Sequence, residues 1–179
     1  MEISFDPDNP KWITTDEELR AALGKCSKCN SMTGGGTYII PWNMLDDTKF
    51  DVQHNFCVII NTLDGGGSET AVGHWICLSV NVFSRQAVLF DPLDSLYRTH
   101  PAILSKVTSF CNKRNVKFNY LFMKTQQYDS MACGIHILWF IHRIHEISIE
   151  GMLKIKKMFK DCLLKNVERY VMLEVSRRF

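Results

Sequence analysis

Short apolar runs alternate with longer helical patterns along this chain of 179 residues, and that alternation limits the folds open to it. Four runs have the length and the β-branched or aromatic content of strands: 56–60, 74–82, 86–90 and 118–123. A hydrophobic content of 46% is enough to fill a core. With helical segments before, between and after the strands, the chain is predicted to form an α+β fold over residues 1–179, a single domain with a small mixed sheet packed between helices.

The helical segments have recognisable start signals or periods. Thr15 and Glu18 form the pattern of a capping box, which predicts a first helix. Pro101 is a favoured first-turn residue and begins a second helix. Residues 133–144 are nearly all apolar and too many for a typical strand, so they predict a buried central helix. A final amphipathic helix is expected over 152–175, with lysines opposite its apolar stripe.

Charge is distributed unevenly although the net value is only +2. The first 50 residues carry a net −3, residues 51–150 are neutral, and residues 151–179 carry eight basic and three acidic side chains. The basic end fits DNA or an acidic partner, and it fits equally the solvated face of an amphipathic helix.

Seven cysteines in a chain that opens without a secretory pattern predict a protein that is not secreted and has no disulfide framework. No apolar run approaches the roughly 20 residues of a membrane span, so no membrane association is expected. Cys26 and Cys29 form half of a zinc pattern without a second pair, and no metal site is predicted. The cysteines in apolar runs are expected to pack in the core: Cys57, Cys77 and Cys162.

A further cysteine is accompanied by the groups that a nucleophilic thiol needs. His74 opens one strand-like run and Asp91 follows the next, so antiparallel pairing would bring the carboxylate to the imidazole. Cys133 would begin the central helix, where exposed amides and the helix dipole favour the thiolate. Gln126 or Gln127 could supply an amide donor for an oxyanion. A lone cysteine is more often a buried small hydrophobe, but this combination predicts catalysis.

At these residues the chain resembles the adenovirus-type cysteine endopeptidases, the adenain family, which are related to the ubiquitin-like-protein proteases. The family order of His, acid, Gln and Cys is matched by His74, Asp91, Gln126 and Cys133, with Leu-Phe-Asp-Pro at 89–92 similar to the family's Leu-Phe-Glu-Pro. The resemblance covers roughly residues 15–145 and implies a papain-like fold whose central helix begins at the nucleophile.

The resemblance also implies roles for these residues. His74 would be the general base, Asp91 its orienting partner and Cys133 the nucleophile. Gln126 would form the oxyanion hole with the Cys133 amide; it stands seven residues before the cysteine as in adenain, whereas Gln127 has the six-residue spacing of the ubiquitin-like-protein proteases.

Two other residues near the site have interpretations of their own. Trp75 would stack beside the histidine, a role that the resemblance implies. Asp94 is the other candidate for the acid, and its position after Pro92 favours a solvated turn.

The implied activity is cleavage of viral capsid or core precursors during virion maturation, by a monomer located in the virion and the infected cell, in the nucleus if it is adenovirus-like. The chemistry requires no cofactor, although DNA or an activating peptide stimulates adenoviral members. Their disulfide to the peptide is not carried over, because residues 117–123 hold no cysteine. The alternatives are a ubiquitin-like-modifier protease with the same triad and a catalytically inactive DNA-binding or packaging module. A bacterial-effector-like acyltransferase also uses a His, acid and Cys set, but it would require a cofactor site that the sequence does not indicate.

Overall fold

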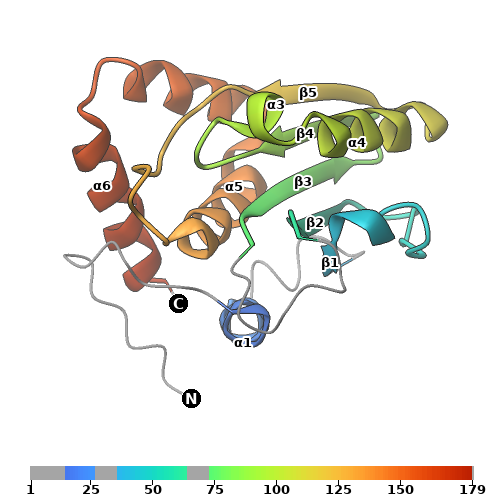
Figure 1. The fold of residues 1–179 in the computed structure, drawn as a ribbon, viewed down its shortest axis with the longest axis horizontal. Coiled ribbons are helices and arrows are strands. Elements are labelled where there is room, and N and C mark those ends of the chain that lie inside the picture. The colour runs from blue at the N-terminus through green and yellow to red at the C-terminus, as the bar shows by residue number, and fades with distance from the viewer. Residues whose placement is uncertain (1–14, 27–35, 64–72, 179) are drawn as a thin grey trace.

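A computed structural model of the chain describes residues 15–26, 36–63 and 73–178. In these residues one α-helix precedes the first four strands, and the other α-helices lie before and after the fifth strand (Figure 1). In chain order the elements are α1 (Asp16–Lys25), β1 (Thr37–Pro41), the 3-10 turn η1 (Trp42–Met44), β2 (Phe56–Asn61), β3 (Trp75–Asn81), β4 (Gln86–Phe90), α3 (Leu96–Thr99), α4 (Pro101–Lys113), β5 (Lys117–Leu121), α5 (Cys133–Phe159) and α6 (Leu164–Ser176).

The five strands form one mixed sheet in the order β1-β2-β3-β4-β5. The central pairs β2–β3 and β3–β4 are antiparallel, and the outer pairs β1–β2 and β4–β5 are parallel. Side chains of a strand alternate between the two faces: Trp75 and Cys77 of β3 join the core under α1, α5 and α6, whereas Ile76 and Leu78 join the core under α4. The predicted α+β class is confirmed, with the sheet between helices and a central helix that begins at Cys133 (Figure 1).

The start of α1 follows the predicted capping box. The Thr15 hydroxyl accepts a hydrogen bond from the Glu18 amide at 3.2 Å, and the Glu18 carboxylate accepts one from the Thr15 amide at 2.8 Å. These bonds satisfy amides that a helix N-terminus leaves open. The helix is thereby fixed to bury Leu19, Ala22 and Leu23 in the core that also holds α5.

Strand β1 and the single turn α3 were not predicted from the sequence. β1 is an edge strand whose residues are all partly buried, and its apolar run of Tyr38, Ile39 and Ile40 is shorter than the roughly four to eight residues by which strands are recognised and ends at a proline. It pairs in parallel with β2, from Thr37 opposite Cys57 to Pro41 opposite Asn61. A proline is tolerated at such an edge because its missing N–H is not needed by a further strand.

The prediction of one helix over 152–175 is wrong. Residues 152–159 belong to α5, which bends at Ser148 (φ 63°), and the chain turns over 160–163 before α6 begins. A straight helix would separate Met152 from Val171 by roughly 28 Å at 1.5 Å per residue. The turn folds α6 back so that both side chains enter the same core.

The same turn overturns one of the cysteine predictions. Cys162 lies on the turn and is exposed, whereas Cys57 and Cys77 are buried as predicted. Cys26 is buried too, with its sulfur 3.7 Å from a ring nitrogen of His142, and Cys29 lies outside the described residues. None of the described helices is both long and apolar enough to cross a membrane.

Candidate active site

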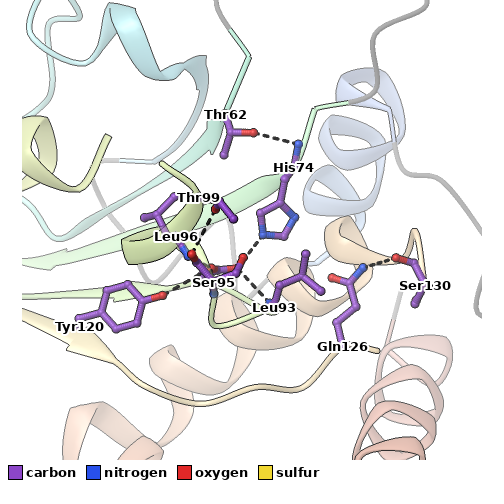
Figure 2. Close-up of polar contacts among 10 residues, drawn as sticks. Thr62, His74, Leu93, Ser95, Leu96, Thr99, Tyr120, Gln126 and Ser130 are labelled. Carbon is purple, nitrogen blue, oxygen red and sulfur yellow. Dashed lines mark hydrogen bonds and ion pairs between the residues drawn. The ribbon is translucent and has the colours of Figure 1, made fainter. Parts of the chain in front are cut away.

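His74 is held at the point where β3 begins. The Thr62 amide donates to the His74 carbonyl at 2.9 Å, and the His74 amide donates to the Thr62 hydroxyl at 3.1 Å, which extends the pairing of β2 with β3 (Figure 2). The residue before it must be small, because a Cβ at Gly73 would come within 1.9 Å of the Asn61 side-chain oxygen. The backbone of the histidine is therefore fixed by the sheet and by this close approach.

The imidazole of His74 contacts Asp91, as antiparallel pairing of β3 with β4 predicts. The distance from His74 Nε2 to Asp91 Oδ1 is 2.6 Å. Three backbone amides also donate to this fully buried carboxylate: Leu93 at 2.9 Å, Ser95 at 2.7 Å and Leu96 at 2.8 Å. Figure 2 shows these amides in the turn that follows β4. The carboxylate is thus fixed in place, and its orientation is set independently of the histidine.

These contacts shift the ionisation of both side chains. Burial opposes the charge of Asp91, but His74 and the amides of Ser95 and Leu96 outweigh it and lower the pKa of Asp91. Burial would likewise lower the pKa of His74, but hydrogen bonds and charge interactions with Asp91 and Cys133 raise it to about 9. Because this value exceeds the ordinary 6.5, the pair stabilises the folded state below about pH 6.5, and that contribution is lost as the pH rises through about 9.

Asp94, the other acid considered, lies in the turn after Asp91. Its backbone has a left-handed φ of 51°, and burial together with the charge of Asp91 raises its pKa. The Tyr120 hydroxyl lies 3.4 Å from Asp91 Oδ2 and also interacts with Asp94. Asp91 is the acid that contacts His74, whereas Asp94 interacts with Asp91.

Cys133 is the first residue of α5 and is 7% exposed. Cys133 interacts with His74, and this interaction contributes to the raised pKa of the imidazole. Because Asp91 occupies Nε2 of the imidazole, Nδ1 is the nitrogen left for the thiol. Ala132, the N-cap residue, has no side-chain group to cap the helix, so the first-turn amides of α5 are left for an incoming oxyanion.

The two candidate glutamines point to different partners. Gln126 is 1% exposed, and its Nε2 donates to the Ser130 carbonyl at 2.7 Å (Figure 2). Its amide orientation follows from that bond, because a carbonyl needs a donor. Gln127 Nε2 donates to Glu168 of α6 at 2.7 Å. Both side-chain amides are therefore held by hydrogen bonds, and the role of Gln126 or Gln127 as an oxyanion donor stays a prediction.

The loop that carries Gln126 is attached to the turn beyond Asp91. The Thr125 and Gln126 amides both donate to the Pro92 carbonyl, at 2.9 and 3.1 Å. The Pro92 carbonyl thus joins the segment that carries Gln126 to the turn that follows Asp91. Trp75 begins β3 and is buried in the same core as Cys133; its stacking on the histidine stays a prediction.

Two further buried polar residues, His136 and Glu168, lie near the site, and the sequence assigned neither of them a role. His136 lies one turn after Cys133 on α5 and is fully buried, 3.6 Å from the Glu168 carboxylate. Burial lowers the pKa of His136 despite that carboxylate, and the charge of His74 acts in the same direction. The available sequence signal was an acidic residue next to Val167 within the apolar pattern of α6.

Replacing Asp91 by asparagine should slow alkylation of Cys133 by iodoacetamide at pH 8 by about tenfold or more, since one pKa unit is a factor of ten in charge state. Without the carboxylate, burial prevails and the pKa of His74 falls from about 9, so the imidazolium that stabilises the thiolate is lost at a lower pH. The measurement is the rate of labelling against pH. Asp94→Asn is the control from the same turn, and an equal shift in that variant would contradict the assignment of Asp91.

Among the described residues, no group of three or more His, Cys, Asp or Glu side chains is placed to hold a metal ion. The reactive groups that the site does contain are the Cys133 thiol, the His74 imidazole and the Asp91 carboxylate. Together they form a cysteine–histidine–aspartate arrangement beside a helix N-terminus, which is the constellation of nucleophilic catalysis.

Comparisons with known proteins find similarity among solved structures alone. No protein-family model and no curated protein matches the chain. The SUMO protease Ulp1, solved with its catalytic cysteine oxidised to a sulfinic acid, matches with a TM-score of 0.47 and 11% identity over 93% of this chain and 80% of its own. A deletion variant of AvrA with IP6 and CoA matches with a TM-score of 0.48 and 13% identity over 76% of this chain. The match spans about half, 52%, of the AvrA chain.

Proposed function

We propose that this protein is a cysteine endopeptidase. The observation that carries the proposal is that one imidazole contacts a buried, amide-bound carboxylate through Nε2 and interacts with the thiol at the start of α5. A carboxylate in that position fixes the tautomer and orientation of the base. A thiol at a helix N-terminus, next to an imidazolium, has the surroundings of a reactive cysteine.

The proposed mechanism is acyl transfer. The Cys133 thiolate forms a C–S bond with the scissile carbonyl carbon, and the C=O electron pair moves to oxygen. That oxyanion is stabilised by the Cys133 amide and the Gln126 side chain. When the adduct collapses, the C–N bond breaks and His74 Nδ1 gives its proton to the leaving amine. Water that loses a proton to His74 then attacks the thioester, and the thiolate leaves.

The proposed substrates are viral capsid or core precursors, cleaved during virion maturation. The sequence supports this through the adenain-like order of His74, Asp91, Gln126 and Cys133 and the Leu-Phe-Asp-Pro segment at 89–92. Small residues, glycine above all, are expected next to the scissile bond. The corresponding location is the virion and the infected cell, in the nucleus if the source is adenovirus-like.

Stimulation by DNA belongs to the same proposal. Lys156, Lys157 and Lys160 line a groove of about 580 Å³ together with apolar side chains, among them Phe122 and Leu153. Lysines that alternate with aromatic and apolar groups suit a single-stranded or bent nucleic acid. Lysine side chains also cover apolar surface on many helices that bind no nucleic acid. Peptide cleavage measured with and without DNA distinguishes the two interpretations of this groove.

The test uses the purified full chain with a panel of glycine-containing peptides, a ubiquitin-like modifier carrying a carboxyl-terminal extension, and a thiol-directed probe. We expect the protein to cleave peptides of the panel, and we expect the labelling of Cys133 to depend on His74. Cleavage of the modifier fusion alone would favour the modifier-protease alternative. Labelling of Cys133 no faster than that of exposed Cys162, without cleavage of either substrate, would favour the inactive DNA-binding module.

A further inference from the structure

A carboxylate that the proposed mechanism does not use lies buried beneath the active-site loop. Glu168 is on α6 and is 2% exposed, between Val167 and the other apolar residues with which α6 packs on α5. Burying a carboxylate is unfavourable unless its oxygens are paired. A leucine or valine at this position would satisfy the packing of α6. Packing alone therefore does not explain why a carboxylate is buried here.

The partners of Glu168 come from the segment that joins Gln126 to Cys133. Its Oε2 accepts a hydrogen bond from Gln127 Nε2 at 2.7 Å, and its Oε1 lies 3.4 Å from the Gln127 amide. Burial opposes its charge, yet interactions with His136, 3.6 Å away, and with Ser130 and Gln127 outweigh burial and lower its pKa. One ionised side chain thus binds both the side-chain amide and the backbone of this loop at Gln127.

Those contacts reach the proposed oxyanion donor through one residue. Ser130 interacts with Glu168, and the Ser130 carbonyl accepts the hydrogen bond that orients the Gln126 amide, at 2.7 Å. The Ser130 hydroxyl also lies 3.3 Å from the Ala132 amide, next to Cys133. Glu168 contacts neither His74 nor Asp91, whose own geometry is set by β3, β4 and the turn after β4.

We propose that Glu168 is a positioning residue for the oxyanion hole: from α6 it fixes the 127–130 loop and so the direction of the Gln126 amide. The inference rests on the proposed function, because Gln126 matters only if an oxyanion forms. It assigns the carboxyl-terminal helix a part in catalysis that is separate from its contribution to the core.

The steady-state test combines Glu168→Gln with Gln126→Ala. The glutamine keeps the size of the side chain but presents an amide nitrogen to the Gln127 amide, so the loop is no longer bound on both oxygens. We expect Glu168→Gln to lower kcat about tenfold with KM within about twofold, because an oxyanion hole acts on the transition state. In the Gln126→Ala background the same substitution should change kcat less than about twofold, because the two residues act as one unit.

Glu174→Gln is the matched control on the same helix. Glu174 is also largely buried and forms ion pairs with Arg143 and Arg178, away from the 127–130 loop. It is expected to lower thermal stability as much as Glu168→Gln while leaving kcat within about twofold. Equal losses of kcat in both variants, or a full tenfold loss in the Gln126→Ala background, would overturn the inference.

A second measurement does not depend on turnover. Hydrogen exchange of the backbone amides at 126–132 should be faster in Glu168→Gln than in the wild type or in Glu174→Gln. Unchanged exchange in that segment overturns the inference even if peptides are cleaved. Faster exchange in a protein that cleaves nothing supports the fixing of the loop while the endopeptidase proposal fails, so the two failures are distinguishable.

Discussion

Cys133→Ala should lower kcat/KM for peptide cleavage by at least about 10⁴-fold, the scale observed when the nucleophile of a triad is removed. The other described thiols lie on other elements. Cys26 follows α1, Cys57 and Cys77 are buried on β2 and β3, Cys111 is buried on α4, and Cys162 lies on the turn after α5. The measurement is cleavage of the best peptide of the glycine panel, with the folded state checked by circular dichroism. Because Cys133 is a small side chain that already borders Ala132, alanine should be accommodated without loss of the fold.

Cys162→Ala is the control for this substitution. Its thiol is exposed and lies outside the site, so the variant should cleave at the wild-type rate. Cleavage that survives Cys133→Ala would remove the basis of the proposed mechanism, because no covalent intermediate could then form on this chain at that position.

His74→Ala is expected to lower kcat/KM by about 10³-fold or more, because it removes both the proton acceptor and the cation that stabilises the thiolate. The raised pKa of His74, about 9, means that the imidazolium is present through neutral pH. In the variant, alkylation of Cys133 should follow ordinary thiol ionisation and increase steadily with pH. The measurement is the pH profile of labelling together with peptide turnover.

His54→Ala provides the matched control. His54 is exposed and pairs with Asp51, 2.8 Å away. It precedes β2, whose other end, at Asn61, pairs with Trp75 next to His74. Added imidazole should restore part of the activity of His74→Ala and none of that of Cys133→Ala. Similar losses in His54→Ala and His74→Ala would show that the assay reports stability instead of chemistry.

Several features of the site could be predicted from the sequence because they depend on neighbours in the chain. The pairing of two consecutive strands places Asp91 beside His74, and a short turn leaves little choice of register. The start of a long apolar helix at Cys133 is likewise a local property. The roles of these residues in catalysis stay predictions until the variants are measured.

Other features depend on contacts between distant segments, which a local pattern does not contain. The hydrogen bond from Gln127 to Glu168 is such a contact, because Glu168 is 41 residues from Gln127 along the chain. The break at 160–163 was missed because the residues on both sides favour helix, and only the return of α6 to the α5 core decides it.

The sequence by itself determined the alternation of strands and helices, the helix that begins at Cys133 and the neighbourhood of His74 and Asp91, because each follows from hydrophobic period or from adjacent strands. The tertiary structure alone decided that α6 folds back under the loop and that Glu168 binds it. The physical reason is that a buried carboxylate is stable only where hydrogen-bond donors surround it. Here the donors come from a loop far from Glu168 in the chain, and only the packing of α6 brings the two together.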